Sequence, residues 1–173
     1  LKAAGLSNSP LPQELIAAVG DPFQAVAVGL LLGAREAGIP VLLGGGSQML
    51  AVLALALETI RPSCRSKFVD QISIATTSWL LEELTTVKPR GSGLTMLTDL
   101  VGSSFGVELF GLASGLRFHK SNRKPLKDYE RGFVKEGVGA GALSLLALLN
   151  GATIRELILG CEKALDSLET RVY

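Results

Sequence analysis

The sequence has 173 residues, 47 % of them hydrophobic and 19 % charged, with a net charge of +1 and a mean hydropathy of +0.38. This composition excludes a disordered chain and is typical of a single domain, which at this size buries ~70 % of the surface that its unfolded chain would expose. The near-zero charge excludes a global field that attracts nucleic acid or lipid.

The first element with clear boundaries is a helix after Asp21. Asp21 is a typical N-cap, Pro22 occupies the first helical position, and Gln24 stands three residues after the cap, as in a capping box. We expect this helix to end at Gly38, with Pro40 just beyond it.

Strands and helices then alternate. IPVLLGGG predicts a buried strand at 39–43, and a helix begins near Ser47. The β-rich run 68–76 predicts a second strand. SWLLEELTT, which follows it, is a short helix or a loop. A helix over 94–106 and a strand over 107–113 complete the alternation.

The last third of the chain opens with a basic, loop-like stretch of 26 residues, and two helices close the chain. Thr153 and Glu156 form a capping box at the start of the final helix. Apolar residues then share one face of it at helical spacing: Ile154, Leu157, Ile158, Cys161, Leu165 and Leu168.

Alternating strands and helices predict the fold class α/β, a Rossmann-like layered domain with a mainly parallel sheet flanked by helices. We expect residues 1–173 to form a single such domain. Ligands of parallel sheets bind outside the carboxyl ends of the strands. That rule selects GGGSQ after the first strand, ATTSW after the second and the basic stretch after the third.

The apolar content predicts a large buried interface. Residue 1 is Leu rather than Met, so we expect the chain to be the carboxyl-terminal part of a longer protein that associates with itself or with its missing part. The longest apolar stretches fall short of the ~20 residues that a bilayer demands, so no membrane partner is expected. Two cysteines indicate a reducing interior, and we expect a cytoplasmic protein with Cys161 in its core.

Gly44, Gly45 and Gly46, followed by Ser47, stand between a strand and a helix. Backbone amides at such a helix start are an anion site when no side chain obstructs them. A tight strand-to-helix turn explains the same glycines equally well. Thr76, Thr77 and Ser78, which follow the second strand, either cap the next element or contact a ligand.

The basic stretch contains seven of the seventeen Lys and Arg residues, between Arg117 and Lys135. Arg and Lys at a strand terminus favour a phosphate-bearing small molecule. A solvated surface and a nucleic-acid site are the alternatives, although no nucleic-acid-binding motif is present. His119 is the sole histidine, which excludes a histidine-based metal cluster.

Glu136 precedes three glycines, Gly137, Gly139 and Gly141. The helix macrodipole alone would favour an acid in a first helical turn. The glycines, however, are poor helix formers and indicate that something approaches the backbone closely. A carboxylate beside such a turn could act as a general base.

GLLLGAREAGIPVLLGGGSQMLAVLALAL (29–57) together with KEGVGAGALSLLALLN (135–150) resembles nicotinate-nucleotide–dimethylbenzimidazole phosphoribosyltransferase. The resemblance is stronger to a related, uncharacterised archaeal and cyanobacterial branch, through KPLKDYERGFVKEGVGAG (124–141). It covers nearly the whole chain but only the carboxyl-terminal half of the family's usual length.

The resemblance implies a Rossmann-like homodimer that transfers phosphoribose from nicotinate mononucleotide to a benzimidazole-type base, in the pathway to the lower ligand of cobamides. The family's base is a glutamate in a Gly-Glu-Gly stretch, which falls on Glu136. We expect no metal or other cofactor. The expected ligand contacts are Gly44, Gly45, Gly46, Ser47, Lys120, Ser121, Arg123, Lys124, Lys135, Gly137 and Gly139, with Lys120, Arg123 and Lys124 for phosphate.

The chain departs from the family pattern in two places. The family has an Asp-Gly-Phe type sequence where this chain has Gly44-Gly45-Gly46, and the family's serine-and-histidine stretch is replaced by FHKSNRKPLKDYERG. The alternative function is therefore a nucleotide-binding or regulatory protein that keeps the fold without the transfer activity. The expected partner in both cases is a small nucleotide, rather than nucleic acid.

Overall fold

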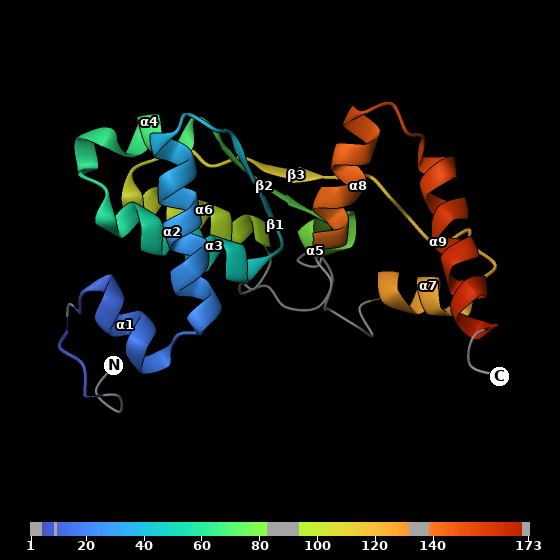
Figure 1. Cartoon of the computed structure of the whole chain (residues 1–173), viewed down its shortest axis with the longest axis horizontal. Helices are drawn as coiled ribbons and strands as arrows, with labels where there is room; N and C mark the ends of the chain where they lie inside the picture. Colours follow the sequence, from blue (N-terminus) through green and yellow to red (C-terminus); the bar gives the residue numbers. More distant parts are fainter. Residues whose placement is uncertain (1–4, 9, 83–93, 132–138, 171–173) are drawn as a thin grey trace.

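A parallel three-stranded sheet organises the chain (Figure 1). The computed structural model describes residues 5–8, 10–82, 94–131 and 139–170. Strands β1 (Val41–Gly44), β2 (Ile72–Thr76) and β3 (Gly111–Ala113) lie in the order β1-β2-β3, and both neighbouring pairs are parallel. Helices flank the sheet, which confirms the predicted α/β, Rossmann-like layered fold.

One face of the sheet packs on the hydrophobic core. Val41 and Leu43 of β1 are in register with Ile72 and Ile74 of β2, and paired residues of parallel strands share a face. Leu43, Ile72 and Ile74 are buried in the core cluster. Helices α2 (Pro22–Glu36), α3 (Ser47–Thr59) and α6 (Leu94–Phe105), together with Phe68 and Val69, supply the rest of that cluster, including the fully buried Leu53.

Helix α2 begins and ends as its sequence predicts. The Asp21 carboxylate accepts from the N–H of Phe23 at 2.7 Å, and the Gln24 side-chain oxygen accepts from the N–H of Asp21 at 3.2 Å. Gly38 has a φ of +68°, the left-handed conformation that glycine adopts without strain at the end of a helix. Helix α1 (Pro12–Val19) precedes α2 and was not predicted.

The opposite face of the sheet carries Gly44 and Ala75, which are also in register. Helix α8 (Gly139–Leu149) lies on this face and contacts all three strands. Figure 1 shows α8 and the helices α2 and α3 on opposite sides of the strands.

Two predicted strands were too long. Phe68 and Val69 belong to helix α4 (Arg65–Val69), which follows the 3-10 turn Pro62–Cys64, because a short apolar run fits a buried helix as well as a strand. Pairing of β3 begins only at Gly111, opposite Ile74. SWLLEELTT contains a short helix, α5 (Ser78–Glu82).

The basic stretch is not purely a loop, because helix α7 (Lys124–Glu130) lies inside it. The final helix, α9 (Ile154–Glu169), confirms its predicted capping box. The N–H of Glu156 donates to Thr153 Oγ1 at 3.2 Å, and the N–H of Thr153 donates to Glu156 Oε2 at 2.8 Å. Among the described residues, no helix combines the length and the hydropathy needed to cross a membrane.

Candidate functional site

The carboxyl ends of the three strands meet along one edge of the sheet, as the fold predicts. The N–H of Gly45, just after β1, donates to the carbonyl of Ala75 in β2 at 3.0 Å. The N–H of Ser114, just after β3, donates to the carbonyl of Thr76 at 3.3 Å. These bonds bring the glycine turn 44–46, the hydroxyl residues 76–78 and Ser114 together. Ser114 was missed, although a serine directly after a strand was the signal for it.

The glycine turn leads directly into a helix. Helix α3 begins at Ser47, as predicted, whereas β1 runs from Val41 to Gly44 rather than over 39–43. Gly46 is the N-cap residue of α3 and supplies no side-chain cap, and a Cβ at Gly46 would meet no atom of the described residues within 4 Å. The first turn of α3 therefore presents backbone amides beside open space. This geometry suits an anion, and it also fits a simple tight turn, so both interpretations stand.

The start of α8 packs onto the same edge. A Cβ at Gly44 would lie 2.8 Å from the Cβ of Ala142 and 3.7 Å from the Cα of Gly139. A Cβ at Gly141 would lie 2.1 Å from the carbonyl carbon of Thr76 and 2.4 Å from the backbone nitrogen of Thr77. The close approach that we expected at these glycines is therefore, at Gly141, an approach to β2 rather than to a ligand.

Thr76 and Thr77 are the most unusual polar residues at this edge. Their side chains are 0 % and 1 % exposed, and neither hydroxyl has a hydrogen-bond partner among the described residues. Neither hydroxyl therefore caps α5, which was one of the two roles expected for these residues. Buried hydroxyls without a partner are rare because each costs about 1–3 kcal/mol. A site that a ligand fills is one reason to keep such groups.

Part of the basic segment 117–131 is bound to α9. Ser121 Oγ donates to Glu162 Oε1 at 2.5 Å, and the N–H of Arg123 donates to Ser121 Oγ at 3.1 Å. The Arg123 guanidinium pairs with Asp166 and lies 3.8 Å from Glu169. These contacts give Ser121 and Arg123 a structural role, and their predicted ligand contacts stay a prediction.

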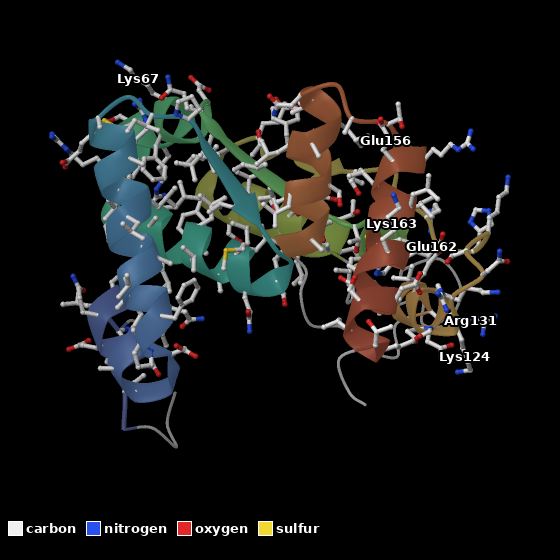
Figure 2. All side chains as sticks on the ribbon, turned by 45° about the vertical axis from the view of Figure 1, so that its right-hand side comes forward. Lys67, Lys124, Arg131, Glu156, Glu162 and Lys163 are labelled. Carbon is white, nitrogen blue, oxygen red and sulfur yellow. The ribbon has the colours of Figure 1, made fainter. Side chains whose placement is uncertain are left out.

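The other charges of the segment are also partly neutralised. Lys124 and Arg131 both pair with Asp128, and Arg117 lies 3.4 Å from Glu130. Figure 2 shows Lys124 and Arg131 gathered beside α9, below Glu162. Lys120 is exposed. Of the cations predicted to bind phosphate, Lys120 is the one for which the described residues provide no salt bridge.

Aromatic packing joins the basic segment to α5. The Trp79 ring lies 5.2 Å from the Tyr129 ring, edge to face, and 6.0 Å from the buried Phe118 ring. Burial, with a smaller contribution from Cys161, raises the pKa of the Tyr129 hydroxyl. The packing occupies rings that a nucleic-acid site would use for base stacking, and it places the segment beside α5, which starts next to Thr77.

Cys161, which was predicted to lie in the core, is only half-buried, on a helix none of whose residues is buried. Burial and the neighbouring Glu162 raise the pKa of its thiol. The described residues contain no group of three His, Cys, Asp or Glu side chains that could hold a metal ion. Three predicted site residues, Lys135, Glu136 and Gly137, lie outside the described residues.

The comparisons connect the chain to named relatives. It is 59 % identical over 168 residues to a UPF0284 protein of Prochlorococcus marinus (strain MIT 9313), covering 97 % of this chain. A UPF0284 protein of Parasynechococcus marenigrum (strain WH8102) is 54 % identical over 95 % of the chain, and one of Picosynechococcus sp. is 40 % identical over 95 %. The chain is a relative of the UPF0284 proteins.

These relatives are much longer than the chain, which spans 42 %, 41 % and 42 % of their respective lengths. No family model matches the chain. The relatives' names assign no activity and no link to the phosphoribosyltransferase, so that part of the resemblance stays a prediction.

Proposed function

We propose that the chain carries part of a nucleotide site at the carboxyl edge of its sheet, and that the protein transfers phosphoribose from nicotinate mononucleotide to a benzimidazole-type base. The observation that carries the proposal is the packing of α8 on that edge. Gly139, the first residue of α8, lies beside Gly44. Glu136 precedes Gly139 by three residues, and three residues of chain reach at most about 11 Å.

The chemistry fits a lone carboxylate. In this transfer the acceptor nitrogen attacks the anomeric carbon of the ribose and the bond to nicotinate breaks. Glu136 accepts the proton that the acceptor nitrogen loses, and nicotinate leaves with the electron pair of the broken bond. The amides at the start of α3 would hold the phosphate of the nucleotide. The hydroxyls of Thr76 and Thr77, which are buried in this structure, would join them only where ligand binding opens the edge of the sheet.

A non-catalytic nucleotide-binding protein is the second candidate, and Gly44 favours it. The family places an acid where this chain has Gly44, yet a Cβ there would lie 2.8 Å from the Cβ of Ala142. An acidic side chain at this position would force α8 away from β1. The site is therefore built without that acid, and binding could persist where transfer does not.

The test is nicotinate release, measured by chromatography, from the natural gene product that contains these residues. It is incubated with nicotinate mononucleotide and 5,6-dimethylbenzimidazole, and Glu136→Gln is compared with Glu36→Gln, a change at an exposed residue of α2. Release that falls at least about 100-fold only in Glu136→Gln supports the transferase. Nucleotide binding without release favours the second candidate.

A further inference from the structure

Helix α8 has no polar face. Its sequence, GAGALSLLALL, contains a single polar side chain, Ser144, whose hydroxyl donates to the carbonyl of Ala140 within the helix at 2.6 Å. A helix that is apolar all round is normally buried all round. Yet Leu143, Leu146 and Leu149 are 69 %, 43 % and 74 % exposed.

The sheet face beneath α8 is also incompletely covered. Leu112 of β3 is in register with Ala75, so it belongs to the face on which α8 lies, and it is 40 % exposed. Phe110, directly before β3, is 60 % exposed. Parallel sheets are covered on both faces because their strands are apolar on both sides. The core face is covered by helices that include α2, α3 and α6, whereas the other face carries α8, which contacts all three strands.

We propose that the exposed apolar residues of α8 (Leu143, Leu146 and Leu149) and those at β3 (Phe110 and Leu112), an element that α8 contacts, bind a further apolar layer. The layer is supplied by the residues that lie outside the matched segment in the longer UPF0284 relatives. Two observations select this occupant. The relatives have more than half of their length outside the match. The exposed apolar residues also lie on α8 and at β3, which stands at one end of the strand order. A further helix or strand of an α/β domain would pack at such a position.

The proposal predicts that one set of substitutions lowers the melting temperature of the full-length relative but not that of the 173-residue chain. Leu143, Leu146 and Leu149 are replaced together by Gln in the 173-residue chain, and the aligned positions are replaced by Gln in the full-length Prochlorococcus marinus MIT 9313 protein. The short chain should keep its melting temperature or gain solubility, because exposed positions tolerate polar groups. The full-length protein should lose at least ~5 °C, because there the positions are buried.

In the matched control, Met96 and Leu100 of α6 are replaced by Gln in both proteins. These residues are also exposed, but they belong to the helix layer on the core face. This change should leave both melting temperatures within about 1 °C of the unchanged proteins. An equal change, or no change, in the full-length and short proteins with the α8 substitutions overturns the proposal. Light scattering that shows a dimer of the short chain, dissociated by the α8 change, overturns it as well, because the occupant would then be a second copy.

Discussion

Gly141 of α8 lies against the carbonyl carbon of Thr76 at the end of β2, at a distance that leaves no room for a Cβ. This contact sets how closely α8 approaches the carboxyl edge of the sheet. It also fixes the position of Gly139, the first residue of α8, which follows Glu136 by three residues in the sequence. The packing of one glycine is therefore coupled to the geometry of the proposed site.

Gly141→Ala should destabilise the protein. The new Cβ would lie 2.1 Å from backbone, which has no flexible end to move aside, so the free energy of unfolding should fall by about 1–3 kcal/mol or more. Thermal unfolding measures the loss. Gly139→Ala is the matched control in the same helix, because the nearest atom to its Cβ would be 4.0 Å away. Equal stability of Gly141→Ala and the unchanged protein would refute the close contact.

Thr76→Val and Thr77→Val should separate stability from binding. Removing a buried hydroxyl that has no partner should raise the free energy of unfolding by about 1 kcal/mol. If the hydroxyls contact the nucleotide, the same changes should weaken binding of nicotinate mononucleotide about tenfold, as measured by calorimetry.

Thr98→Val is the control for this pair of changes. Thr98 is buried, but its hydroxyl donates to the Leu94 carbonyl at 2.8 Å, so its removal should bring no gain in stability and no loss of binding. Unchanged affinity in both Thr76→Val and Thr77→Val would remove these hydroxyls from the proposed site.

Arg123→Gln should test whether the basic segment has a structural role. Its guanidinium pairs with Asp166 and lies near Glu169 at a partly exposed position, so stability should fall by roughly 0.2–1 kcal/mol, and less at high salt. The affinity of Arg123→Gln for nicotinate mononucleotide should stay within twofold of that of the unchanged protein. Lys120→Gln, a change at an exposed lysine, is measured for comparison. A tenfold loss of affinity in Arg123→Gln would instead restore Arg123 as a phosphate contact.

Thr153→Ala should destabilise α9 by about 1 kcal/mol through loss of the N-cap. The hydrogen bonds from the backbone and side chain of Thr153 lower the pKa of Glu156, so the folded state favours its ionised form. That contribution is present above the ordinary pKa of a glutamate and is lost as the pH falls through the lowered value. The difference in melting temperature between Thr153→Ala and the unchanged protein should therefore narrow from pH 7 to pH 3 without vanishing, because the N-cap bond to the N–H of Glu156 does not titrate.

Local signals in the sequence predicted the elements whose ends carry their own chemistry. Asp21 with Gln24, Gly38, and Thr153 with Glu156 all define helix ends through short-range hydrogen bonds or a left-handed φ, and the structure confirms each of them. The parallel pairing and the α/β class followed from the alternation of apolar runs with helical segments.

The misses share a cause in contacts between distant residues. Phe68 and Val69 lie in a helix because they fill a core built from α2 and α3, which no local pattern reveals. The pairing of Arg123 with α9 and the lack of partners for Thr76 likewise depend on residues far along the chain. The glycines near Glu136 were recognised as sites of close approach, yet only the structure identifies β2 as the neighbour of Gly141.

The central claim is that a nucleotide binds in the open space beside the glycine turn, and calorimetry with nicotinate mononucleotide tests it most directly. A Cβ at Gly46 meets no atom of the described part of the chain within 4 Å, so Gly46→Leu should fold. Gly33→Leu on α2 offers the same open space away from the site. The account predicts binding that weakens at least about tenfold in Gly46→Leu and stays unchanged in Gly33→Leu, because the leucine would occupy the ligand's place. Equal affinity in the two variants, or no binding to the unchanged protein, would contradict it.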